Sequence, residues 1–155
     1  VSSGKVGLLA DLMSGMEPEF SGYKNVELLM AYWGIPFFKR DDVLEDVLAF
    51  TELEPSMSDR VINFSAGMKM RLAFALATFA KPSILLIDEV IGTGDKWFRE
   101  KSQRRLLNLK EETIIVMATH NREVLLQNCS IGLVLIGGEA QFVGPIEDAL
   151  NVKFQ

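Results

Sequence analysis

The sequence lacks the features of several protein classes. Its only cysteine, Cys129, cannot form an internal disulfide, so a disulfide-stapled fold is excluded and a reducing, cytosolic compartment is expected. Its longest largely apolar stretch, Leu72–Ala80, is far shorter than the ~18 residues that a membrane-spanning helix needs. With 48% hydrophobic and 24% charged residues, the chain has the composition of an ordinary soluble globular domain.

Clustered positive charge is also scarce. The formal net charge is −5, and the densest basic stretch, residues 99–105, holds four basic residues together with Glu100. A nucleic-acid partner requires clustered lysine and arginine to neutralise phosphates. We therefore expect no nucleic-acid partner and interpret residues 99–105 as a solvated helix face.

A glycine-rich phosphate-binding loop is missing as well. Ser3–Val6 resembles only the end of such a loop, because the upstream glycine is absent and Val6 stands where a serine or threonine would bind Mg²⁺. Gly92-Thr93-Gly94 is not a dinucleotide-binding fingerprint, since Trp97 takes the place of its third glycine.

The first residues indicate a sequence cut inside a domain. Val1–Leu12 has neither the basic start nor the cleavage site of a signal peptide, and strand-like sequence begins almost at once, at Lys5–Leu9. We expect residues 1–155 to be a single incomplete domain whose N-terminal part is missing.

Hydrophobic spacing and breaker residues divide the chain into a helical segment and a segment in which strands and helices alternate. Helices are expected at residues 25–33, 41–53 and 66–80, after a loop over 11–22. Further on, we expect strands at 83–87, 113–118 and 131–136, helices at 96–109 and 123–128, a turn at Gly137-Gly138 into 140–143, and a short helix opened by Pro145. The prediction is an α/β fold with a largely parallel sheet flanked by helices. An α-helical lobe would span about 16–64, and residues 1–15 and 65–155 would form the rest of the core, with the helix after Ser65.

Two carboxylates follow the apolar strand Ile84–Ile87. Such a strand would hold Asp88 and Glu89 at the carboxyl edge of the sheet, where α/β folds bind ligands. Asp88 would there anchor a Mg²⁺ ion through its water shell, and Glu89 would polarise an attacking water as general base. The alternative is a parallel strand that ends in acids before a loop, without chemistry.

Small residues open the helix expected at 66–80. Ser65, Ala66 and Gly67 would expose backbone N–H groups at a positive helix end, which suits a phosphate, and the Ser65 hydroxyl can donate as well. The alternative is a capped amphipathic helix whose small residues only allow close packing.

The only histidine, His120, follows the strand expected at 113–118. A lone histidine is more often a surface or core residue than a catalytic one. At the carboxyl end of a strand, near an acid pair from another strand, a contact with a γ-phosphate becomes the favoured interpretation.

These residues occur in the order and at close to the intervals of the motifs of ABC ATPases, which are P-loop NTPases, and the chain resembles that family over essentially its whole length. In this resemblance Phe64–Met68 is the signature, Ile84–Asp88 is the Walker B strand with Glu89 next, Gly92–Asp95 is the D-loop, and His120 is the switch histidine. The Walker A motif of the family has no counterpart in the chain.

A narrower resemblance is to the bacterial ATPases that export O-antigen, capsule and teichoic acid. Phe64–Ala75 resembles the variant signature of that group, Val90–Asp95 resembles its apolar pair followed by Gly-x-Gly-Asp, and Glu17–Val26 resembles its segment entering the helical lobe.

The chain departs from the usual ABC pattern at three places. Ala66 and Met68 replace the first glycine and the glutamine of the signature, and both are tolerated in the exporter variant. The Q-loop glutamine is missing, since the first glutamine of the chain is Gln103.

The resemblance implies an ATPase with ATP and Mg²⁺ as cofactors. Asp88 would hold the metal, and Glu89 and His120 would act on a nucleotide bound to their own chain. Two domains would pair head to tail as a homodimer, with Asp95 between the two sites. The nucleotide-binding residues reaching across to the partner's γ-phosphate would be Ser65, Ala66, Gly67 and Met68.

The resemblance also implies a location and a task. Glu17–Tyr23 and the helical lobe would meet a membrane permease, so the protein would be cytoplasmic and peripheral on the inner face of the cell membrane. ATP hydrolysis would power export of a polysaccharide or related glycolipid across the bacterial inner membrane. The chain by itself, without a phosphate-binding loop, is expected to be inactive.

Two other functions remain open at this point. An ABC-type ATPase of DNA repair or translation would call for long coiled-coil insertions or basic surfaces, and the sequence has neither. A non-catalytic pairing module is the second alternative, and the presence of Glu89 and His120 argues against it for the whole protein.

Overall fold

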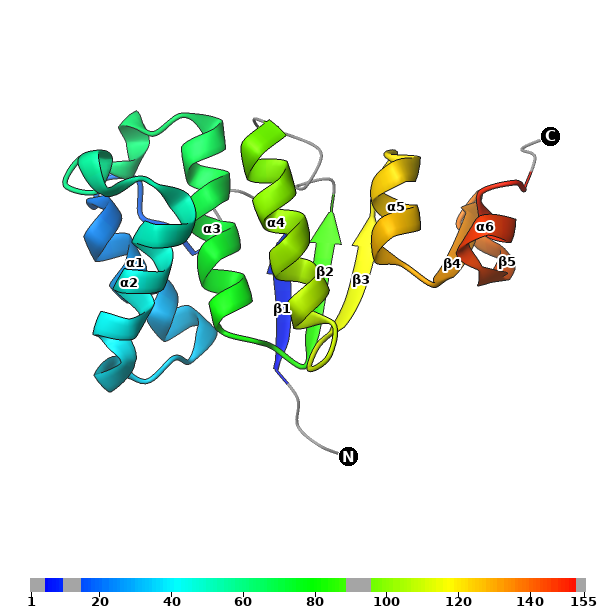
Figure 1. Cartoon of the computed structure of the whole chain (residues 1–155), viewed down its shortest axis with the longest axis horizontal. Coiled ribbons are helices and arrows are strands. Elements are labelled where there is room, and N and C mark those ends of the chain that lie inside the picture. The colour runs from blue at the N-terminus through cyan, green and yellow to red at the C-terminus, as the bar shows by residue number, and fades with distance from the viewer. Residues whose placement is uncertain (1–4, 10–14, 89–95, 153–155) are drawn as a thin grey trace.

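The computed structural model of the chain describes residues 5–9, 15–88 and 96–152 (Figure 1). Its first half contains β1 (Val6–Leu9), α1 (Gly22–Trp33), the 3-10 turn η1 (Phe37–Lys39), α2 (Arg40–Thr51), the 3-10 turns η2 (Glu54–Ser56) and η3 (Val61–Asn63), and α3 (Ala66–Phe79). Its second half contains β2 (Ile84–Asp88), α4 (Lys96–Leu109), β3 (Ile114–Ala118), α5 (Arg122–Asn128), β4 (Ile131–Ile136), β5 (Glu139–Pro145) and α6 (Ile146–Ala149). Every expected helix and strand is present, whereas the three 3-10 turns were not predicted.

The strands β1, β2 and β3 form a parallel sheet with β2 in the centre. They pair in register, Val6 with Ile84 and Ile84 with Ile114. Because the strands run in the same direction, their carboxyl ends meet at one edge, the upper edge in Figure 1. This arrangement confirms the expected α/β fold.

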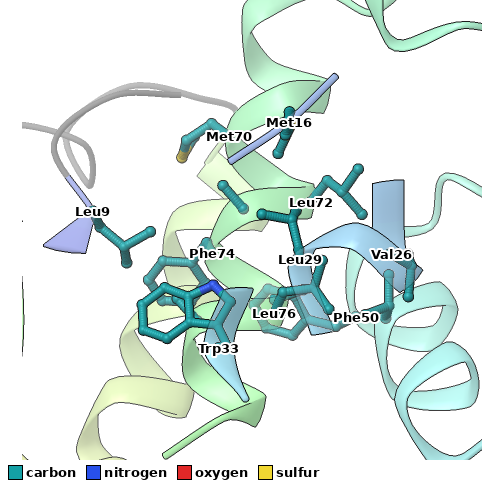
Figure 2. Packing of buried hydrophobic residues seen from close by; sticks show 14 of the residues in the cluster. Leu9, Met16, Val26, Leu29, Trp33, Phe50, Met70, Leu72, Phe74 and Leu76 are labelled. Atoms are coloured by element: carbon teal, nitrogen blue, oxygen red, sulfur yellow. The ribbon is translucent and has the colours of Figure 1, made fainter. Parts of the chain in front are cut away.

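The helix α3 lies at the centre of the core. All seven residues from Leu72 to Thr78 are buried, because α1 and α2 pack on α3 from the lobe and the sheet packs on it from the other side. Figure 2 shows side chains of α1 and α2 gathered against this helix, among them Trp33, Leu29 and Phe50. A helix enclosed in this way is apolar around its whole circumference, which explains the apolar run in the sequence.

The ends of α1 are set by capping. The Ser21 hydroxyl accepts a hydrogen bond from the backbone N–H of Lys24 at 3.2 Å, so the helix begins three residues earlier than its apolar spacing predicts. At the other end Gly34 adopts a left-handed conformation, with φ of 64°, and ends the helix as expected. The buried Asn25 side chain ties the helix to the preceding loop by hydrogen bonds to Glu17 and Phe20.

The strands β4 and β5 form a separate antiparallel hairpin. Gly137 and Gly138, both with positive φ, make the tight turn that the sequence predicts. In the described residues β4 therefore pairs with β5 and does not extend the parallel sheet. The physical reason is local, since a two-residue turn returns the chain alongside β4 before a distant strand can pair with it.

The two faces of the parallel sheet are covered unequally. Leu85 and Ile87 face the core made by α3 and α4 and are buried. On the opposite face Val6 is 61% exposed, Ile114 65% and Val116 53%. We call this second face the open face of the sheet, and it comprises Val6, Leu8, Ile84, Leu86, Ile114 and Val116.

Within residues 5–9, 15–88 and 96–152, none of the helices is both long and apolar enough to cross a membrane.

Candidate nucleotide-handling site

The carboxyl edge of the sheet holds one of the two predicted acids. Asp88 is the last residue of β2, is exposed, and pairs in register with Ala118 at the end of β3. The position at a strand end agrees with the sequence prediction. Glu89 and Asp95 lie outside the described residues.

His120 follows β3 by two residues and is exposed at the same edge of the sheet. The turn that carries it is held by hydrogen bonds. Thr119 Oγ1 accepts from the backbone N–H of Asn121 at 3.2 Å, and Asn121 Oδ1 accepts from the N–H groups of Glu123 and Val124 at 3.1 and 3.2 Å. Because Asn121 caps α5 in this way, His120 sits on a constrained connection between a strand and a helix.

The start of α3 presents unused backbone donors. Ser65 is the N-cap, and its Oγ accepts from the N–H of Met68 at 3.2 Å. The backbone N–H of Lys69 donates a hydrogen bond to the Ser65 carbonyl at 3.0 Å. The N–H groups of Ala66 and Gly67 precede the first intrahelical hydrogen bonds, so they remain available to an external acceptor such as a phosphate.

Gly67 leaves open space beside these donors. A Cβ atom placed there would come no nearer to another atom than 3.8 Å, the distance to Ser65 Oγ. The packing of the described residues therefore does not require a glycine here. A close approach from outside the chain is one physical reason to keep a helix position without a side chain.

The start of α3 and the ends of β2 and β3 lie at the same end of the molecule (Figure 1). This follows from the chain path, since α3 runs down to a short turn and β2 runs back up. Among the residues that the structure describes, no three histidine, cysteine or acidic side chains form a metal-binding group. The sequence predicts a metal contact for Asp88 alone, and carboxylate oxygens are ligands that Mg²⁺ accepts.

Comparison with known proteins decides the family. Residues 2–92 match the family described as ABC transporter. The chain belongs to the ABC transporter family. It is 34% identical over 143 residues to the O-antigen export system ATP-binding protein RfbB of Myxococcus xanthus, covering 92% of the chain and 33% of that protein. It is 36% identical over 131 residues to the corresponding protein RfbE of Yersinia enterocolitica, covering 84% of the chain and 55% of that protein.

Two further comparisons agree with these. The teichoic acids export ATP-binding protein TagH of Lactococcus lactis is 29% identical over 149 residues, covering 96% of the chain and 32% of that protein. A solved structure of an ATP-binding subunit of an ABC transporter superposes with a TM-score of 0.82 at 20% identity, covering 93% of the chain and 60% of that structure, and supports the fold. The chain thus spans between a third and about half of the length of the curated relatives compared here.

A surface cleft of this ABC transporter chain lies between α4 and α5. It has a volume of about 310 Å³ and is lined by polar side chains that include Lys96, Arg99 and Asn128. Of the predicted site residues that the structure describes, none lines it. The exposed ones among them are Asp88, His120, Ser65 and Ala66.

Among the described residues, the pKa values of Glu27 and Cys129 are shifted, and neither group belongs to the predicted site. Hydrogen bonds from Lys24 and Arg40 hold the pKa of the Glu27 carboxyl below its usual value. Partial burial raises the pKa of the Cys129 thiol, which disfavours the reactive thiolate form.

Sequence reasoning missed one set of contacts that joins the helical lobe to the core. Lys101 and Arg105 of α4 bind residues of α2 that precede them by 52 and 59 positions. The sequence suggested only a solvated basic face for this stretch. Contacts between residues so far apart in the sequence produce no local sequence pattern from which they could be predicted.

Proposed function

We propose that the chain is most of the nucleotide-binding domain of an ABC exporter whose ATP hydrolysis drives export of a polysaccharide or related glycolipid across the bacterial inner membrane. The family match supports a nucleotide-binding role. The printed functions of the relatives, O-antigen and teichoic acid export, support the exporter class. The permease partner and a peripheral position on the inner face of the membrane follow from the same class.

The observation that carries the proposal is the arrangement at one end of the molecule. Asp88 and His120 extend from neighbouring parallel strands, and the first turn of α3 offers the N–H groups of Ala66 and Gly67. In a head-to-tail pair, the Asp88 edge of one copy and the start of α3 of the other would together supply a phosphate chain and its Mg²⁺ ion with a carboxylate for the metal and N–H donors for the oxygens.

Each residue has a role in this proposal. Asp88 holds Mg²⁺ through water, Glu89 accepts a proton from the attacking water, and His120 contacts the γ-phosphate. In a head-to-tail homodimer, Ser65 and the neighbouring N–H groups up to Met68 contact the γ-phosphate bound to the other copy. Asp95 lies between the two sites and links them.

The test uses the protein encoded by the complete reading frame, including any codons upstream of Val1. We expect ATP hydrolysis, and we expect Glu89→Gln to lower turnover by about 10²- to 10⁴-fold, because general-base catalysis typically contributes that much. ATP binding should survive, so the variant should accumulate as an ATP-bound dimer in size-exclusion chromatography. Normal turnover of Glu89→Gln would show that Glu89 is not the base.

A second pair of variants separates the γ-phosphate contact from helix capping. Ser65→Ala removes the N-cap, which costs about 0.5–2 kcal/mol of stability. Ser65→Asp keeps the cap but places a negative charge against the phosphate. We expect both variants to weaken ATP-dependent dimerisation, and only Ser65→Ala to lower the melting temperature. Wild-type dimerisation of Ser65→Asp would contradict the proposed contact.

The 155-residue chain by itself is expected neither to bind ATP tightly nor to hydrolyse it, since remote residues do not replace a loop of converging N–H groups. Isothermal calorimetry measures this directly, and micromolar ATP affinity would refute the expectation. If the complete protein paired in an ATP-dependent manner without hydrolysis, the non-catalytic pairing module would be the better assignment.

A further inference from the structure

Three helices meet at a buried aromatic cluster. Phe50 of α2, Phe74 of α3 and Phe98 of α4 have ring centroids 5.5 to 6.0 Å apart, and each side chain is at least nine-tenths buried. Aromatic pairs in such geometry contribute beyond the area that they bury. This cluster places one ring from the helical lobe directly against α4.

Two cations of α4 lie over the Phe50 ring. Arg105 Cζ is 4.5 Å and Lys101 Nζ is 5.5 Å from the centroid, and Lys101 Nζ is also 4.6 Å from the Trp97 ring. Cations at these distances are attracted to the face of an aromatic ring. The long side chains therefore cross from α4 onto α2 along an apolar surface.

The same cations bind polar groups of the neighbouring helices. Arg105 makes two hydrogen bonds to the Asp46 carboxylate, at 3.0 and 2.6 Å, and one to the carbonyl of Ala75 in α3 at 3.2 Å. Lys101 donates to the carbonyl of Ala49 at 2.7 Å and contacts Glu52 at 3.3 Å.

The last turn of α2 is the negative end of its helix dipole, where positive charge is stabilising. It contains no basic residue of its own. Lys101 and Arg105 come from α4, and Arg71 of α3 donates to the carbonyl of Thr51 at 3.0 Å. Positive charge from other elements thus stabilises the negative end of the helix dipole.

The Arg105–Asp46 ion pair is less exposed than the Lys81–Glu112 pair. The Arg105 side chain is 18% exposed and the Asp46 side chain 33%, whereas the side chains of the Lys81–Glu112 pair are 56% and 61% exposed. A bidentate, partly buried pair is screened less and holds a defined geometry, unlike a single exposed contact.

We propose that Lys101 and Arg105 are positioning residues that lock α4 to α2 and so set the orientation of the helical lobe relative to α4. The functional part of this inference rests on the proposed function. In the sequence, α4 begins at Lys96, directly after residues 89–95, which include Glu89 and Asp95. The helix α2 also packs on α3, and Ser65 is the N-cap of α3. The lock therefore ties the orientation of the lobe to the helix that directly follows residues 89–95 in the sequence.

The first test uses the 155-residue chain and needs no nucleotide. Spin labels at Asp42→Cys in α2 and Glu111→Cys after α4, in a Cys129→Ser background, report the distance between lobe and core by double electron–electron resonance. We expect Arg105→Ala to broaden or shift the distance distribution. The matched control is Arg104→Ala, an exposed arginine of the same helix, and it should leave the distribution unchanged.

A charge exchange separates positioning from simple destabilisation. Asp46→Arg alone should disturb the distribution, and Asp46→Arg combined with Arg105→Asp should restore it at least in part, because the ion pair is rebuilt in reverse. Arg105→Lys keeps the charge without the bidentate geometry and should be intermediate. Distributions identical to wild type in Arg105→Ala and Asp46→Arg, or a failure of the exchange to restore anything, would overturn the proposal.

The second test uses the protein from the complete reading frame. Because small misplacements of a catalytic group cost up to about 100-fold in rate, Arg105→Ala should lower kcat by as much as that while the KM for ATP stays the same. Arg104→Ala should have normal kcat. If the complete protein does not hydrolyse ATP, the proposed function fails while the resonance experiment still decides the lock. If Arg105→Ala disturbs the distances but leaves kcat unchanged, the link to catalysis is wrong.

Discussion

The two faces of the parallel sheet carry similar residues and have opposite environments. Leu85, on the covered face, is fully buried against the helices, and Val116, on the open face, is 53% exposed. The sequence does not distinguish them, since both belong to continuous apolar runs of the kind found in strands buried on both faces. This comparison shows that a continuous apolar run predicts a strand buried on both faces, whereas among the described residues helices cover only one face of the sheet.

The largest expected effect contrasts the two faces directly. Leu85→Ala should lower the free energy of unfolding by about 2–5 kcal/mol, because it leaves a cavity in the core. Val116→Ala should change it by no more than about 0.5 kcal/mol, as is usual for exposed positions. Urea unfolding followed by circular dichroism measures both. A similar loss in the two variants would mean that the open face is covered in solution.

The second prediction asks what happens to the open face at high concentration. An exposed apolar sheet face favours association, so we expect the 155-residue chain to self-associate in sedimentation velocity experiments. Ile114→Lys together with Val116→Lys should shift the distribution toward monomer. The control is Leu107→Lys, which alters a 46% exposed leucine on α4. A wild-type chain that stays monomeric would contradict the prediction.

The third prediction extends the comparison to α3, which is buried in its middle and open at its start. Gly67→Ala should raise the stability of the chain by about 0.4–1 kcal/mol, because alanine restricts the unfolded chain and nothing lies within 3.8 Å of the new methyl group. In the complete protein the same methyl group should weaken ATP-dependent dimerisation. Thermal unfolding and size-exclusion chromatography measure the two effects. A loss of stability would show that the first turn of α3 is already covered.

The smallest effect concerns a surface contact of the helical lobe. Lys24 and Arg40 lower the pKa of Glu27 in the folded chain from its usual value of 4.5. A carboxyl with a lowered pKa stabilises the fold above pH 4.5, and this contribution is lost as the pH falls through the lowered value. Between pH 6 and pH 3, Glu27→Gln should therefore lose less stability than wild type. Equal losses, measured by urea unfolding at several pH values, would show that the pair contributes nothing.

Much of the fold could be predicted because its determinants are local. Ser65 caps α3, Gly34 ends α1, and Gly137-Gly138 turns the hairpin, and each acts on residues within a few positions. The shifted start of α1 was missed because Ser21 lies in a loop-like stretch, where apolar spacing gives no indication of a cap. The 3-10 turns were missed because three residues are too few for a period to be visible.

The candidate site was only partly predictable. The positions of Asp88 and His120 at strand ends follow from the strand pattern, and the structure puts both at one edge because the strands are parallel. The roles of Glu89, Asp95 and the residues at the start of α3 stay predictions.

The sequence by itself determined the types and order of the elements, the caps and turns, and the resemblance to ABC ATPases, because hydrophobic period and motif spacing are local properties of the chain. Only the tertiary structure decided which face of the sheet is covered and that Lys101 and Arg105 bind α2. These outcomes depend on contacts between residues far apart in the sequence. A basic residue on a helix face can bind a partner or remain in solvent, and the outcome depends on which surface packs against that helix.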